Sequence, residues 1–160
     1  MAFHALIIGY GNPLRSDDAI GWHAAEVLQL GMPPLETEVI CVHQLTPELA
    51  EAASRADYLL FLDAACQGNP GQMLCSAVCP NTEAAQFSHQ LTPEQLLTLC
   101  RQLYGTYPHA YTLSVAAETF DHGETLSEPV RKALPLLLTT SCELLARLSQ
   151  TNASLEEARF

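Results

Sequence analysis

Short apolar stretches alternate with segments of helical periodicity along most of the chain. Five stretches have the length and composition of strands, at residues 5–9, 38–42, 58–63, 73–78 and 111–116. Four segments repeat their apolar residues at helical spacing, at residues 19–30, 47–54, 93–104 and 127–148. The first and third strands are almost continuously apolar, which is typical of parallel strands covered on both faces. The pattern predicts an α/β fold, a three-layer sandwich with a twisted, mainly parallel sheet of roughly five strands flanked by helices.

Turn-forming and helix-breaking residues add detail to this arrangement. The sequence Gly68-Asn-Pro-Gly71 predicts a turn and makes the fourth strand a candidate hairpin partner of the third. Pro135 lies inside the last helical pattern, so we expect that helix to kink or restart near Leu134. The polar residues 151–160 are expected to form a flexible tail. No segment has the composition of a linker, and residues 1–150 are therefore expected to form a single domain.

Composition and charge exclude several classes of protein. A chain of 160 residues with 48% hydrophobic content can bury a substantial core. Its net charge of −11, with only seven Lys and Arg residues, argues against nucleic acid or an anionic membrane as a partner. No apolar run approaches the roughly 20 residues of a membrane span, and no basic segment of a signal peptide begins the chain. The six cysteines are expected to be reduced core thiols. We expect a cytoplasmic protein that is a monomer.

A glycine-rich turn follows the first strand, in Gly9-Tyr-Gly-Asn-Pro-Leu-Arg-Ser-Asp-Asp-Ala-Ile-Gly21. A dinucleotide fingerprint would need a third glycine where Leu14 stands, and Pro13 lacks the N–H that a phosphate would use. Asp17 and Asp18 would also repel a pyrophosphate at the start of the helix. The segment therefore indicates a cation rather than a phosphate.

The two adjacent carboxylates are expected to have different roles. Successive helical residues point about 100° apart, so both side chains cannot cap the same helix. We expect Asp17 to be the structural helix cap and Asp18 to face the edge of the sheet.

A further carboxylate, Asp63, ends the third predicted strand. The carboxyl end of a parallel strand is the edge at which α/β proteins build their sites, although Asp63 can also be explained as a turn residue. If the first and third strands are neighbours, about 4.8 Å apart, Asp63 and the loop that carries Asp18 converge.

A histidine motif occurs twice, as His43-Gln-Leu-Thr-Pro-Glu48 and His89-Gln-Leu-Thr-Pro-Glu94. In each copy Thr can cap a helix, Pro takes its first position and Glu its first turn. One good solution for starting a helix explains both copies, and a histidine held before a helix explains them equally well. Two carboxylates and one imidazole suit Zn²⁺ or Ni²⁺, with positions left open for water or substrate. Spacing alone does not choose between His43 and His89.

Together these motifs resemble the maturation endopeptidases of [NiFe]-hydrogenases. The segment from Gly9 to Gly21 matches the opening signature of that family, and Leu62-Asp-Ala-Ala65 resembles its second acidic motif. Ser88-His-Gln90 resembles its histidine motif, and Gly123-Glu-Thr-Leu-Ser-Glu-Pro-Val130 resembles the stretch before its last helix. The family has an α/β fold and removes a short C-terminal peptide from the hydrogenase large subunit once nickel has been inserted.

The resemblance implies a nickel-dependent endopeptidase whose metal-contacting and catalytic residues are Asp18, Asp63 and His89. It thereby selects His89 over His43. The substrate would be the hydrogenase large-subunit precursor, and nickel would be supplied with that precursor. The alternative is a non-catalytic nickel-binding chaperone or checkpoint module with the same three ligands. A third interpretation is an unrelated α/β hydrolase that acts on a small molecule.

Overall fold

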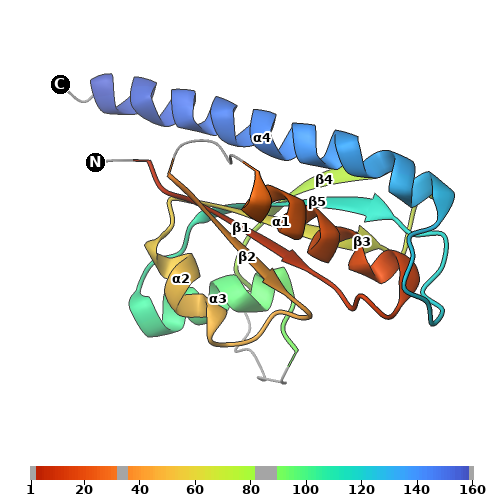
Figure 1. The fold of residues 1–160 in the computed structure, drawn as a ribbon. Coiled ribbons are helices and arrows are strands. Elements are labelled where there is room, and N and C mark those ends of the chain that lie inside the picture. The colour runs from red at the N-terminus through yellow and green to blue at the C-terminus, as the bar shows by residue number, and fades with distance from the viewer. Residues whose placement is uncertain (1–2, 32–35, 82–89, 159–160) are drawn as a thin grey trace.

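The computed structural model describes residues 3–31, 36–81 and 90–158, and it is built around one five-stranded sheet (Figure 1). The strands are β1 (Ala5–Tyr10), β2 (Thr37–Val42), β3 (Tyr58–Ala65), β4 (Met73–Val78) and β5 (His109–Ala116). Their order across the sheet is β2-β1-β3-β5-β4. Only β4 runs antiparallel to its neighbour, so the predicted mainly parallel sheet is confirmed, as is the pairing of the first and third strands.

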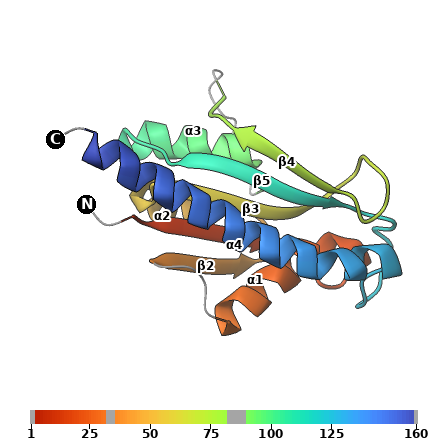
Figure 2. The same cartoon turned by 90° about the horizontal axis from the view of Figure 1, so that it is seen from above.

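Helices cover both faces of the sheet and complete the predicted three-layer α/β sandwich (Figures 1 and 2). They are the short 3₁₀ helix η1 (Ser16–Ala19), α1 (Ile20–Leu30), α2 (Leu49–Arg55), α3 (Pro93–Tyr104) and α4 (Glu128–Glu157). Alternate residues of β1 enter different halves of the core, as strand geometry requires. Leu6 and Ile8 pack with α2 and α3, while Ala5 and Ile7 pack with α1 and α4.

The expected hairpin between the third and fourth strands is wrong. The turn at residues 68–71 is present, and Gly68 and Gly71 adopt the left-handed φ angles of 101° and 86° that favour glycine. However, β4 pairs with β5, because both edges of β3 are already occupied by β1 and β5. After β3 the chain therefore leaves the neighbouring position free for β5 and forms β4 at the outer edge of the sheet.

Helix α4 is one continuous element of 30 residues, so the expected restart near Leu134 is wrong. Pro135 removes one main-chain hydrogen bond, but the buried side chains of Val130 and Leu137 on either side of it pack into the same core cluster. The expected end of the helix at residue 148 is also wrong, because α4 continues to Glu157. Alanine, leucine and glutamate in this polar segment are good helix formers. The separation of a domain at 1–150 from a flexible tail stays a prediction.

Two further observations concern expectations about burial. All six cysteines are free, but Cys66, Cys75 and Cys79 are exposed, so the expectation of core thiols is wrong for these three; Cys100 is buried and half-buried Cys142 packs against the core. Within residues 3–31, 36–81 and 90–158, no helix combines the length and apolar character needed to cross a membrane.

Glycines let α1 lie directly against the sheet. A Cβ on Gly21 would stand 2.0 Å from the main-chain oxygen of Leu62, and a Cβ on Gly9 would stand 2.2 Å from the oxygen of Gly21. Gly11 has a φ of 150°, and its Cβ would stand 1.8 Å from the main-chain oxygen of Asp18. No side chain fits at these positions, so the glycines bring η1 and its carboxylates to the carboxyl end of β1 and β3.

Candidate functional site

Asp63 is the first residue of β3 that no longer pairs with β1. The last pair of that ladder joins Gly9 to Leu62, whereas Asp63 faces Ser114 of β5, and β3 continues to Ala65 rather than ending at Asp63. Strand alternation places the Asp63 side chain on the α2/α3 face, the face of Phe61. Burial, together with the nearby charge of Asp18, raises the pKa of Asp63 from 3.8 to about 6.

Two hydrogen bonds oppose this rise by favouring the ionised carboxylate. The hydroxyl of Tyr10 bonds to the Asp63 side chain, and the main-chain N–H of Ala64 donates to Asp63 Oδ1 at 2.7 Å. The Tyr10 ring meets the ring of Phe61 edge-on, with centroids 6.4 Å apart. Burial and the negative charges of Asp63, Glu94 and Asp18 raise the pKa of Tyr10 above its usual range. Tyr10 therefore stays protonated and remains a donor.

Asp18 lies in η1, and its half-buried carboxylate accepts the main-chain N–H of Asn12 at 2.8 Å. The glycine-rich turn thus folds back on the residue that we expected to face the edge of the sheet. The structure places Asp18 close enough to Asp63 to raise its pKa. Glu94, in the first turn of α3, adds a further negative charge that acts on Tyr10.

Sequence reasoning missed the part played by Tyr10 and used Glu94 only as a favourable charge at a helix start. The sequence did contain a signal for Tyr10. This residue follows Ile8 by two positions on β1, so strand alternation places its side chain on the same face of the sheet as that of Asp63. No sequence pattern of comparable strength places Glu94 there.

Asp17 is structural, but it does not cap its own helix as expected. Its carboxylate is fully buried and accepts hydrogen bonds from the N–H groups of Glu118, Thr119 and Ser127 at 2.9, 3.1 and 2.7 Å. The hydroxyl of Ser127 adds a fourth bond at 2.8 Å. Because Ser127 is the N-cap residue of α4, Asp17 joins η1 to the loop before α4 and to the start of that helix.

The two copies of the histidine motif start their helices differently. Thr92 caps α3 with a complete capping box to Gln95, as expected. The first copy has no side-chain cap, and α2 begins at Leu49, two residues later than predicted. The Leu91 N–H donates to the Leu45 oxygen at 3.0 Å and joins the two copies.

Of the two candidate histidines, His43 is exposed, and its ring lies 6.2 Å from that of Trp22. His89 lies outside the described residues, so its choice as a ligand stays a prediction.

The carboxylates of Asp18 and Asp63 are oxygen ligands of the kind that can bind a cation. Among the described residues, Asp18 and Asp63 supply carboxylate oxygens, and no positive side chain contributes to the pKa of Asp63. A cation would favour ionisation of Asp63, whereas the charge of Asp18 opposes it. Within the described part of the chain, no group of three or more His, Cys, Asp or Glu side chains is arranged to hold a metal ion.

Several solved structures of hydrogenase maturation enzymes have the same arrangement of strands and helices. The hydrogenase maturating endopeptidase HybD from E. coli superposes with a TM-score of 0.76 and 22% identity over 91% of this chain and 93% of its own. This chain has the fold of that endopeptidase. The [NiFe] hydrogenase maturation protease HycI from Thermococcus kodakarensis KOD1 gives 0.72 and 20% over 89% and 92%. An endopeptidase from Escherichia coli gives 0.72 and 22% over 93% and 94%.

Comparisons of sequence alone give no family assignment. No protein-family model matches the chain, and no curated protein matches it. Identities of 20–22% to solved structures establish a shared fold, and the chemistry must be argued from the residues of this chain.

Proposed function

We propose that this chain is an endopeptidase that removes a C-terminal peptide from the large-subunit precursor of a [NiFe]-hydrogenase after nickel has been inserted. The observation that carries the proposal is the close packing of Gly21 against Leu62 and of Gly11 against Asp18. This packing brings η1 with Asp18 to the carboxyl edge of the sheet that carries Asp63, in a fold shared with named maturation endopeptidases. The motif between Gly9 and Gly21 supports it independently, because it resembles the opening signature of that family.

In this proposal nickel is part of the substrate and arrives with the precursor. Asp18 and Asp63 would offer it oxygen ligands and His89 a nitrogen ligand, a set suited to a borderline divalent ion. The ion would polarise the scissile carbonyl group. The remaining chemistry belongs to the side chains of this chain.

Without nickel, burial raises the pKa of Asp63 to about 6, and a cation favours the ionised carboxylate, so Asp63 would release its proton as nickel binds. The Tyr10 hydroxyl holds this carboxylate in place. Half-buried Asp18 is fixed by the Asn12 N–H, and two carboxylates in unequal surroundings are a common basis for separate acid–base and electrostatic roles. The reaction would take place in the cytoplasm, with this chain acting as a monomer.

The test compares nickel-loaded with nickel-free large-subunit precursor, incubated separately with the purified protein. We expect the precursor mass to fall by the mass of a C-terminal peptide only when nickel is present. Binding of the loaded precursor without any loss of mass would instead support the non-catalytic nickel-binding checkpoint module. Cleavage of both forms would refute nickel dependence.

Single alanine substitutions then test the residues. We expect processing to be lost in D18A, D63A and H89A and kept in H43A, which is the matched control because His43 begins the first copy of the same motif. Loss of processing in a folded H43A, with H89A still active, would overturn the choice of His89.

A further inference from the structure

Among residues 3–31, 36–81 and 90–158, nothing pairs with the outer edge of β4. On its inner side this strand pairs with β5. Its residues Cys75, Ser76 and Ala77 are exposed. The strand contains no charged residue and no proline, which are the usual means of protecting an edge from pairing.

The register shows which main-chain groups face outward. The Ala116 N–H donates to the Gln72 oxygen at 2.8 Å, so the main-chain oxygen of Gln72 points toward β5, while its N–H donates to the Asn69 oxygen in the turn. Because this direction alternates along an antiparallel strand, the N–H and C=O groups of Met73, Cys75 and Ala77 point away from the sheet. Three residues therefore present main-chain donors and acceptors to an added strand.

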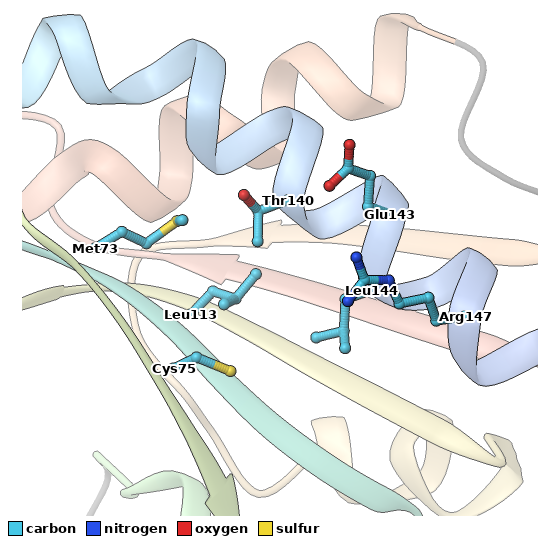
Figure 3. Close-up of a pocket in the computed structure, with 7 residues that line it drawn as sticks. All are labelled: Met73, Cys75, Leu113, Thr140, Glu143, Leu144 and Arg147. Carbon is cyan, nitrogen blue, oxygen red and sulfur yellow. The ribbon is translucent and has the colours of Figure 1, made fainter.

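A cavity of 360 Å³ with a mixed apolar and polar lining opens beside this edge, between the sheet and α4 (Figure 3). Met73, Cys75 and Leu113 line it from the strands and Leu144 from the helix, while Thr140, Glu143 and Arg147 project from α4 around it. Its volume lies within the range of small binding pockets. A strand paired with β4 would direct every second side chain toward this cavity.

The other edge of the sheet is protected in comparison. On β2, the main-chain oxygen of Val39 accepts a hydrogen bond from the Gln29 side chain at 3.1 Å. That strand also carries the charged Glu38, and all six of its residues are half-buried. Among the described residues, the open edge is therefore a property of β4 and not of both outer strands.

We propose that the outer edge of β4 and its adjoining cavity bind an extended segment of the precursor's C-terminal tail as an added strand. The proposal rests on the proposed function. The row that contains Asp63 passes through Ser114 of β5 to Leu74 of β4. A strand added beyond Leu74 would lie about 14 Å from Asp63, which is three strand spacings. About four extended residues span that distance. The cavity and the Asp63 side chain lie on opposite faces of the sheet, so the segment would fill the cavity from the edge and then cross the α2/α3 face of β4 and β5 to reach Asp63.

The chemistry of the segment follows from the lining. Main-chain hydrogen bonds would hold it, and the cavity would accept an uncharged apolar side chain at an alternate position. A second copy of this chain is a poorer occupant, because each copy has a net charge of −11 and the two would repel each other.

The first arm of the test removes an outward N–H without disturbing the ladder between β4 and β5. Proline is tolerated on an edge strand where its N–H would face solvent, so Ala77→Pro is the test variant and Ala77→Thr is the matched control that keeps the N–H. With nickel-loaded precursor, we expect A77P to raise KM about tenfold with kcat within about twofold, whereas A77T changes neither. Cys75→Glu, with Cys75→Ser as its control, places a charge at the cavity and should raise KM similarly. The thermal unfolding midpoint of each variant checks its fold.

The second arm does not depend on catalysis. A synthetic peptide with the sequence of the precursor tail is added to the wild-type protein, and amide hydrogen exchange is followed at Met73, Cys75 and Ala77. We expect exchange at these three amides to slow at least about tenfold, with no change at Leu74. Protection that instead appears on raising the protein concentration alone, together with a dimer in sedimentation, would show that a second copy occupies the edge and would overturn the proposal.

The two arms separate this proposal from the proposed function. If the wild type cleaves the precursor and both A77P and C75E keep its KM, the edge proposal is wrong and the proposed function stands. If the wild type does not cleave the precursor, the proposed function is wrong, and the peptide arm decides the edge: protection at the three amides supports it and unchanged exchange refutes it.

Discussion

Replacing Asp17 by alanine tests whether one buried carboxylate holds the start of α4 to the loop beside the candidate site. The substitution removes the shared acceptor of three main-chain N–H groups, those of Glu118, Thr119 and Ser127, and of the Ser127 hydroxyl. Asp17 itself is fully buried, so these donors lose their partner in a place with little access to water.

The magnitude follows from the number of donors left without an acceptor. Each buried donor without a partner costs about 1–3 kcal/mol, and water that enters the vacated space recovers part of the loss. We therefore expect D17A to lower the free energy of unfolding by about 3–5 kcal/mol, which is at the low end of the sum for four donors because water and small loop movements satisfy some of them. Asparagine keeps the shape and one acceptor oxygen but turns an NH₂ group toward a donor, so D17N should lose about 2 kcal/mol.

Urea unfolding at pH 7, followed by circular dichroism, measures the loss. The matched control is Asp121→Ala, an identical change at an exposed position of the same loop, which should cost less than about 0.5 kcal/mol. Amide exchange should also accelerate at Glu118, Thr119 and Ser127 in the D17A protein. If D17A and D121A unfold at the same urea concentration, the clamp does not stabilise the fold and this reasoning is wrong.

Three further predictions concern other parts of the fold. Burial raises the pKa of Asp63 from 3.8 to about 6, so its ionisation costs stability as the pH rises through that interval. D63N should therefore raise the free energy of unfolding by about 2–3 kcal/mol at pH 8 and by less than about 1 kcal/mol at pH 4, measured by urea unfolding. An equal gain at both pH values would contradict this. G21A should cost about 3 kcal/mol or more in thermal unfolding, because its Cβ would lie 2.0 Å from a main-chain oxygen of β3. G31A, whose nearest contact is 3.4 Å, is the control and should unfold like the wild type. T92A should cost about 1 kcal/mol in urea through loss of its capping box, and T46A, at the uncapped start of α2, should cost almost nothing. Equal losses in these two variants would show that the cap does not matter.

The alternation of strands and helices was predictable from the sequence because it depends on local periodicity. The boundaries of α3 are the predicted ones, since Thr92 and Pro93 start the helix and Gly105 ends it in a left-handed conformation. The partner of β4 was not predictable in this way. It depends on which edges remain free after β1 and β5 have both paired with β3, and that is a property of the whole sheet.

In the candidate site, too, one contact could be predicted from the sequence and another could not. The convergence of Asp18 and Asp63 was foreseeable, because β1 and β3 are parallel neighbours, Asp18 follows the first of them and Asp63 lies near the carboxyl end of the other. The role of Asp17 was not, since its partners at Glu118 and Ser127 stand 101 and 110 positions away along the chain. The local rule for helix starts predicted that Asp17 caps its own helix, whereas its carboxylate binds the residue that precedes α4.

The tight contact of Gly9 with Gly21 also affects how such a sequence changes over evolutionary time. In this chain a Cβ at either position would collide with main-chain atoms, and that cost does not depend on whether the protein carries out a reaction. Natural selection on packing alone would preserve this part of the motif in a descendant that had become inactive. Under the proposed function, Asp18 and Asp63 are kept by the reaction rather than by close packing of a Cβ, so these two carboxylates would be the positions at which a loss of activity first becomes visible in a sequence.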